Sequence, residues 1–170
     1  MTDQKNIASF NSCAAVVLSS LYDSFPVPTQ LDSWSLQPKD AANKTLSIYS
    51  DHRNEELESN EIDENLRVYR WTIQFLIHEG FIRDLDEERL EKIQRYNGNA
   101  PIRAPAAPIF PALALTAKGL ALLNAIPNSI SEKNQSFIER IKAALKEHSE
   151  NGVREVITAF ISQAVTGIIG

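Results

Sequence analysis

This 170-residue chain has one cysteine and three histidines, and neither these nor its carboxylates are spaced for catalysis or for metal binding. The single cysteine, Cys13, lies in an apolar run with no neighbour that would activate its thiol. Carboxylate pairs at 55–56 and 87–88 lie in charged runs, whereas catalysis needs them in a desolvated cleft. The three histidines form no i, i+4 pair and no HExxH zinc motif: His52, His78 and His148. We therefore expect a protein that is not an enzyme, with no metal site and no cofactor.

A polar stripe in the segment 64–82 suits a different chemistry, the recognition of nucleic acid. Its members recur at intervals of three and four, which places them on one face of an α-helix: Arg67, Arg70, Gln74 and His78. The planar guanidinium of arginine pairs bidentately with O6 and N7 of guanine and also binds phosphates. More cations occur in the acid-free stretch 92–131. The candidate DNA-binding residues are therefore Arg67, Arg70, Gln74, Lys92, Arg95, Arg103 and Lys118.

Two observations favour other readings of the same segment. The formal net charge is −5, and seven acids lie in 51–64 and five in 84–91, so the cations also fit scattered surface charges. A second apolar stripe, Val68, Trp71 and Phe75, lies on the flank of the polar face. Because an exposed tryptophan often packs against protein, the alternative is an interaction module that contacts its partner through these three residues.

Helical periodicity predicts the elements that position these residues. A first helix is expected at 10–25, and it should end at the prolines of 25–28. The central helix has an apolar face of Leu66, Tyr69, Ile73 and Leu76, and Gly80 follows at the position that favours a left-handed backbone. The residues after it, Phe81 and Ile82, predict a strand.

A second strand is expected at 112–115, followed by a helix at 118–125 with Thr116 as its N-cap. A short helix within 39–48 and one or two helical turns within 83–95 are also compatible with the sequence, while 51–64 predicts a solvated loop or helix face. The four prolines of 96–111 predict an irregular loop of a length that is often functional.

The combination of Tyr69, Ile73, Leu76, Gly80, Phe81 and Ile82 with the later run 115–120 (LTAKGL) resembles MarR-type and PadR-type winged-helix regulators over about residues 60–125. The resemblance implies a helix-turn-helix whose third helix enters the DNA major groove, and a β-hairpin wing. Two features depart from it, a long acidic connection before the central helix and a wing enlarged at about 84–111. The fold class expected is mainly α (α+β), a winged helix-turn-helix with a small β-wing plus a C-terminal helical pair.

The C-terminal pair carries a wide apolar face. A first helix has Phe137, Ile138, Ile141, Ala144 and Leu145 on one side and is expected to end near 151–152. The second helix has too broad an apolar face for a surface helix, so it should pack either on the core or in an intermolecular bundle. We favour the bundle, in which the dimerisation residues are Val153, Val156, Ile157, Phe160, Ile161, Val165 and Ile168.

The sequence thus predicts a winged-helix domain at 1–127 and a dimerising extension at 128–170. The expected function is transcription regulation by a homodimer that binds double-stranded DNA. No apolar run reaches the ~18 residues of a spanning helix, so no membrane partner is expected. A lone cysteine and an N-terminus without a basic and apolar leader predict a cytoplasmic protein.

Overall fold

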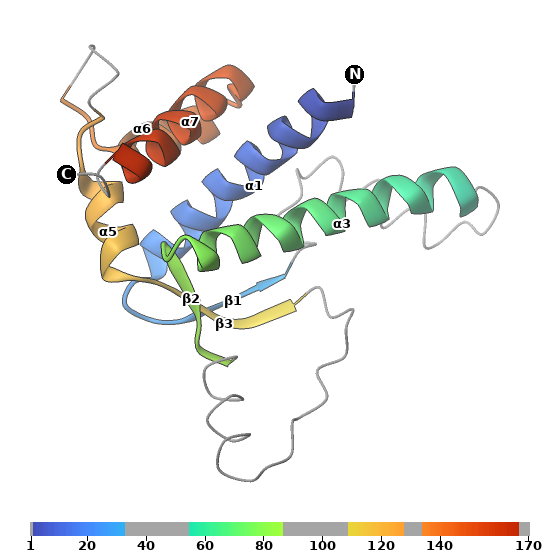
Figure 1. Ribbon diagram of the computed structural model, residues 1–170, viewed down its shortest axis with the longest axis horizontal. Coiled ribbons are helices and arrows are strands. Elements are labelled where there is room, and N and C mark those ends of the chain that lie inside the picture. Colours follow the sequence, from blue (N-terminus) through green and yellow to red (C-terminus); the bar gives the residue numbers. More distant parts are fainter. Residues whose placement is uncertain (1, 33–54, 87–108, 128–133, 167–170) are drawn as a thin grey trace, which may run out of the picture.

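The computed structural model describes residues 2–32, 55–86, 109–127 and 134–166 (Figure 1). Over these ranges the chain is mainly helical with a small antiparallel sheet, as the sequence predicts. The elements in chain order are α1 (Thr2–Ser24), β1 (Thr29–Asp32), α3 (Glu55–His78), β2 (Ile82–Asp84), β3 (Ile109–Leu115), α5 (Ala117–Asn124), α6 (Phe137–Lys146) and α7 (Glu150–Thr166). No helix in this part of the chain is both long and apolar enough to cross a lipid bilayer.

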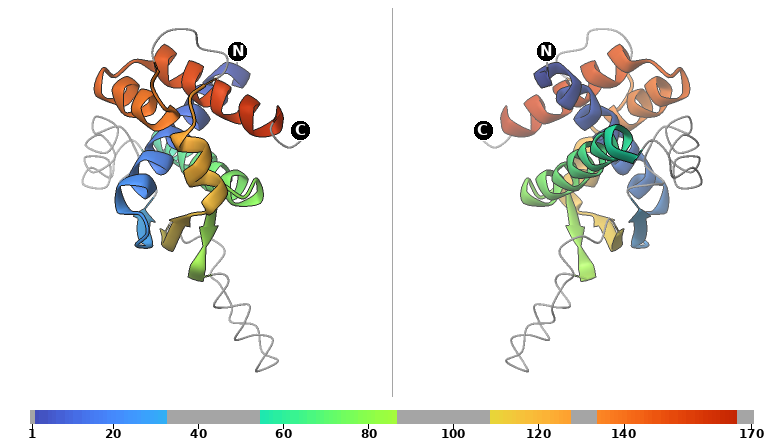
Figure 2. Two further views of the ribbon diagram at one scale, coloured as in Figure 1. Left: turned by 90° about the vertical axis from the view of Figure 1, so that its left-hand side faces the viewer. Right: turned by 90° about the vertical axis from the view of Figure 1, so that its right-hand side faces the viewer.

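The helices and the sheet form layers around α1. Seen end-on in Figure 2, α1 runs from the layer of α6 and α7 to the sheet, and α3 and α5 lie between these two layers. The sheet has the order β1-β3-β2, and both pairings are antiparallel. In the β2–β3 pairing, Ile82 lies opposite Leu115 and Asp84 opposite Leu113. These four side chains lie on one face of the sheet and are all buried, Asp84 among them.

The C-terminal end of α3 has the structure that its sequence predicts. Tyr69, Ile73 and Leu76 are buried on one face, and Gly80 has φ = +72°. The Gly80 N–H donates to the Ile77 carbonyl at 2.9 Å, and the Phe81 N–H donates to the Leu76 carbonyl at 3.0 Å. These two bonds form a Schellman motif, which ends the helix and directs the chain into β2.

Thr116 joins the end of α3 to the start of α5. Its hydroxyl donates to the Gly80 carbonyl at 2.6 Å and accepts from the Gly119 N–H at 3.0 Å, while its own N–H donates to the Phe81 carbonyl at 3.0 Å. The N-cap predicted from the sequence is confirmed. It also satisfies a carbonyl at the end of another helix, which local sequence does not reveal.

Several boundaries differ from those predicted. Helix α1 begins at Thr2 rather than at residue 10, and α3 begins at Glu55 rather than at residue 64, so the acidic run from Glu55 is helical, one of the two alternatives predicted for 51–64. Residues 151–152 lie in the first turn of α7, because α6 already ends at Lys146 and His148 adopts φ = 50° between the helices. The short helix within 39–48 and the proline-rich loop up to residue 108 lie outside the described residues, as do the helical turns within 83–95 beyond residue 86.

One hydrophobic core includes side chains of every described helix and strand. The Phe160 ring of α7 lies 5.0 Å from the Phe81 ring and 5.5 Å from the Phe137 ring, measured between centroids. The C-terminal helices therefore complete the core around α1 and β2. The division predicted at residue 127 does not separate two cores.

The residues assigned to dimerisation need a corresponding correction. Four of the seven are buried within the chain: Val153, Val156, Ile157 and Phe160. Of the other three, Ile161 is half-buried, Val165 is exposed and Ile168 lies outside the described residues. The wide apolar face of α7 is thus covered mainly by α1 and α6, which is the core-packing arrangement rather than a free surface for a second chain.

Candidate functional site on the outer face of α3

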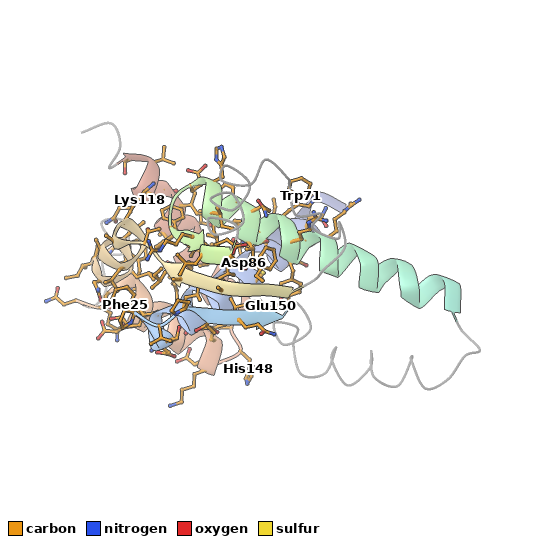
Figure 3. All side chains as sticks on the ribbon, turned by 90° about the horizontal axis from the view of Figure 1, so that it is seen from below. Phe25, Trp71, Asp86, Lys118, His148 and Glu150 are labelled. Carbon is orange, nitrogen blue, oxygen red and sulfur yellow. The ribbon has the colours of Figure 1, made fainter. Side chains whose placement is uncertain are left out.

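The outer face of α3, opposite the buried one, brings together the polar stripe and a tryptophan. Arg67, Arg70 and His78 are exposed on it and Gln74 is half-buried, as the helical spacing predicts. Trp71 lies among them and is 67% exposed, the largest exposed fraction among the large hydrophobic residues that the structure describes. Figure 3 shows Trp71 on the C-terminal half of α3. This group of five residues, Arg67, Arg70, Trp71, Gln74 and His78, is called the outer face below.

The apolar contact stripe predicted from the sequence does not form one exposed surface: Val68, Trp71 and Phe75. Phe75 is half-buried, and its ring packs edge-on against Phe10 of α1 with centroids 5.4 Å apart. Val68 is also half-buried, and its carbonyl accepts the Thr72 hydroxyl at 2.8 Å. Only Trp71 of the three is exposed. The reason is geometric, since Val68 and Phe75 lie about 60° and 40° round the helix from Trp71, towards α1.

Lys118 has an intramolecular role that the sequence did not predict. Its ammonium group donates to the Glu79 carbonyl at 2.6 Å and lies 4.8 Å from the centroid of the Phe81 ring. A cation at this place complements the partial negative charge at the C-terminus of α3. Lys118 therefore contributes to the junction of α3 and α5, and Figure 3 shows it well away from Trp71. The candidate DNA-binding residues Lys92, Arg95 and Arg103 lie outside the described residues.

The first half of α3 differs in charge from the second. Residues 55–64 contain six acids, whereas 65–78 contain none and include Arg67, Arg70 and His78. Carboxylates in the first turn of a helix are stabilised by the macrodipole, which favours acids at the start of α3. Their spacing leaves no acid-free side on a helix of 3.6 residues per turn. The outer face is thus the only cationic part of α3.

Arg83 is an exposed cation that the sequence prediction did not include. It lies on β2 between the buried Ile82 and Asp84. The signal was present, because strand alternation from the apolar Ile82 places residue 83 on the opposite side of the strand. Arg67 and Arg70 are exposed on α3, and Arg83 is a further exposed arginine on β2, after the end of α3.

The buried nucleophiles are not accessible for chemistry. Burial raises the pKa of the Cys13 thiol, so the thiol stays protonated, and a hydrogen bond with Thr72 opposes this shift only in part. Burial also raises the pKa of the Tyr69 phenol, and the adjacent Cys13 adds to the effect. Within the described ranges, no three His, Cys, Asp or Glu side chains form a group that could hold a metal ion.

Comparison of the chain with protein-family models, with curated proteins and with solved structures finds no match.

Proposed function

We propose that this protein is a non-enzymatic winged-helix module that binds a protein partner through the outer face of α3, with Trp71 as the anchoring side chain. The observation that carries the proposal is the exposure of Trp71, at 67%, in the middle of a face that also carries two arginines. Tryptophan and arginine are the residue types that dominate binding energy in protein interfaces. A lone surface tryptophan also loses little conformational entropy when it is buried by a partner.

The order of the elements supports the winged-helix part of the proposal. The resemblance implies a recognition helix, a β-hairpin wing and a closing helix in that order, and α3, β2, β3 and α5 follow it. The antiparallel pairing of β2 with β3 agrees with a hairpin wing, and β1 adds a third strand. Fold alone does not fix function, so the choice of ligand depends on the outer face.

The charge of α3 favours a protein partner over DNA. A recognition helix contacts base edges mainly through its N-terminal residues, and here those residues are the acidic run 55–64. Carboxylates at this place would meet DNA phosphates of the same sign. Lys118 contributes less than a free cation would, because its ammonium group is bound to the Glu79 carbonyl.

DNA binding is the second candidate, and the outer face gives it a specific basis. Arg67 is exposed with Gln74 two turns later, and Arg83 adds a cation on the strand that leads into the predicted wing. Arginine and glutamine are side chains that read guanine and adenine in the major groove. If the protein binds DNA, Arg67 and Arg70 would contribute both to the affinity for DNA and to the dependence of that affinity on salt.

Two variants of α3 distinguish the candidates. We expect Trp71→Ala to abolish capture of a protein partner in cross-linking pull-downs, while Val27→Ala, which shortens an exposed apolar side chain between α1 and β1, leaves capture unchanged. Binding to random duplex DNA, followed by fluorescence anisotropy across a salt series, should be absent or weak. The opposite result would establish the DNA candidate: tight binding that falls steeply with salt and whose salt slope is reduced by Arg67→Ala with Arg70→Ala.

A further inference from the structure

The first turn of α7 contains an Asn-Gly pair, a sequence prone to chemical change. Asn151 and Gly152 are the second and third residues of the helix. Asparagine is a thermolabile residue in proteins. A following glycine makes it most reactive, because no side chain hinders the glycine backbone nitrogen. The pair therefore places a chemically weak point at the start of a helix that completes the core.

Packing against α6 favours a glycine at residue 152. An added Cβ there would lie 3.0 Å from the Ser149 hydroxyl oxygen and 3.3 Å from the Cβ of Ala144. Ala144 is buried on α6, and its carbonyl accepts the Ser149 N–H at 3.0 Å, which holds both neighbours in place. A side chain at residue 152 would therefore crowd the corner between the two helices. The same corner keeps a glycine directly after Asn151.

Two features of α7 keep this pair from reacting. Deamidation begins when the Gly152 backbone nitrogen loses its proton and attacks Cγ of Asn151. Here the Gly152 N–H donates to the Ser149 hydroxyl oxygen at 3.1 Å, and the Ser149 carbonyl accepts the Val153 N–H at 2.9 Å. Ser149 is therefore the N-cap of α7. A helical backbone also has ψ of about −42°, which turns the asparagine Cβ away from the next nitrogen and prevents closure of a five-membered ring.

We infer that Asn151 is a site of spontaneous deamidation that the first turn of α7 keeps closed and that reacts when this turn opens. In the open state the Gly152 nitrogen bonds to Cγ of Asn151, and the side-chain amide leaves as ammonia, which produces a succinimide. Water then adds to one of the two ring carbonyl carbons and breaks its bond to the ring nitrogen. Water is the only co-reactant. The inference is independent of the proposed function, because it uses no residue of the outer face.

The two products differ in their effect on α7. Cleavage at the former side-chain carbonyl gives aspartate, which leaves the main chain unchanged and adds a negative charge that the helix dipole favours in a first turn. Cleavage at the main-chain carbonyl gives isoaspartate, which adds one carbon atom to the main chain between residues 151 and 152. The Gly152 N–H and the buried Val153 are then displaced from their positions. Isoaspartate thus makes a reversible opening of α7 permanent.

Mass spectrometry of the aged full chain tests the inference. Trypsin releases residues 147–154 as one peptide, whose aspartate and isoaspartate forms are separated by chromatography. A synthetic peptide of the same sequence, kept in the same buffer, gives the rate of the open site. We expect the folded chain to deamidate at Asn151 at least about tenfold more slowly than this peptide, because even a modest free energy of local opening gives such a factor. In urea the chain should react as fast as the peptide.

Variants of Ser149 test how the site is closed. Ser149→Ala removes the cap and should speed deamidation about fivefold, the factor by which loss of an N-cap typically shifts the opening of a helix end. Ser149→Asp keeps an oxygen acceptor and should react at nearly the wild-type rate. Ser162→Ala changes an exposed serine further along α7 and is the matched control, with no effect expected. Circular dichroism checks that each variant is folded.

Three rates would overturn the inference: a folded chain that reacts as fast as the peptide, Ser149→Ala no faster than wild type, or Ser149→Asp as fast as Ser149→Ala. The products provide a separate test. Asn151→Asp should unfold at or above the wild-type midpoint, whereas aged chains with isoaspartate should be the first to be cleaved within α7 in limited proteolysis. Isoaspartate distributed evenly between cleaved and intact chains would contradict its proposed effect on the helix.

Discussion

At the scale of single residues, two glycines that look alike in the sequence have different physical reasons. Gly80 has φ = +72°, and an added Cβ there would meet no atom within 4 Å. At Gly119 an added Cβ would lie 2.1 Å from the Phe81 carbonyl oxygen. Backbone conformation therefore requires the first glycine, whereas the close approach of α5 to the residue before β2 requires the second.

These reasons predict that the two positions differ in how well they tolerate asparagine. Gly119→Ala should destabilise the fold by about 1–3 kcal/mol through overpacking, although alanine normally stabilises a helix interior by about 1 kcal/mol over glycine. Gly80→Ala should cost about 1–2 kcal/mol from the left-handed backbone, and Gly80→Asn should recover part of this because asparagine tolerates that conformation. Gly119→Asn should recover nothing. Urea denaturation measures all four variants, and a gain of stability in Gly119→Ala would contradict the close approach.

At the scale of elements, the junction of α3 with α5 depends on one hydroxyl group. Thr116→Val keeps the shape of the side chain but removes the bonds to the Gly80 carbonyl and the Gly119 N–H. We expect a loss of about 1–3 kcal/mol, because a cap is lost and a partly buried carbonyl loses its partner. Thr116→Ser retains the hydroxyl and is the matched control. Equal loss in both variants, by thermal unfolding, would show that packing rather than hydrogen bonding holds the junction.

The start of α6 gives the fold a pH-dependent contribution. Ser136 and Glu139 form a capping box, and the hydrogen bonds from the Ser136 backbone and side chain lower the pKa of Glu139 from its ordinary value of 4.5. A carboxyl group whose folded pKa is lowered adds stability above its unfolded pKa, and this stability is lost as the pH falls through the folded pKa. Wild type should therefore exceed Glu139→Gln in stability at pH 7, and the difference should shrink as the pH falls below about 4.5. A difference that stays constant with pH would contradict the charged capping box.

Local signals explain why the sequence predicts some of these elements and not others. Gly80 and Thr116 were identified correctly because a helix end and a helix start depend on residues next to them. The acidic run before Asn65 is compatible with a loop or with a helix. Repulsion between its carboxylates opposes a helix, whereas the helix dipole favours acids at a helix N-terminus, so the sequence alone does not decide between the two. The bond from Lys118 to the Glu79 carbonyl could not be predicted from the sequence, because the two residues are remote in the chain.

At the scale of the whole molecule, the role of the C-terminal helices could not be read from their periodicity. The wide apolar face of α7 showed that it must be buried, but the same pattern serves a core and a dimer interface. The choice is made by residues far apart in the sequence, such as Phe81 and Phe160, whose ring centroids lie 5.0 Å apart. Contacts of this kind cannot be predicted from composition, and composition is the basis of the boundary predicted at residue 127.

This arrangement makes a prediction about the chain cut after residue 127. Without α6 and α7, Phe81 loses the Phe160 ring, and the buried side of α1 loses part of its cover. Exposing large apolar side chains costs about 1.5–3 kcal/mol each, so exposing four of them costs about 6–12 kcal/mol, which is comparable to the whole stability of about 5–15 kcal/mol of a typical domain. We expect the fragment 1–127 to lack a cooperative thermal transition and to bind a hydrophobic dye, while the full chain unfolds in one step. A fragment that unfolds cooperatively near the midpoint of the full chain would instead establish 1–127 as an independent domain, with α6 and α7 as an addition to it.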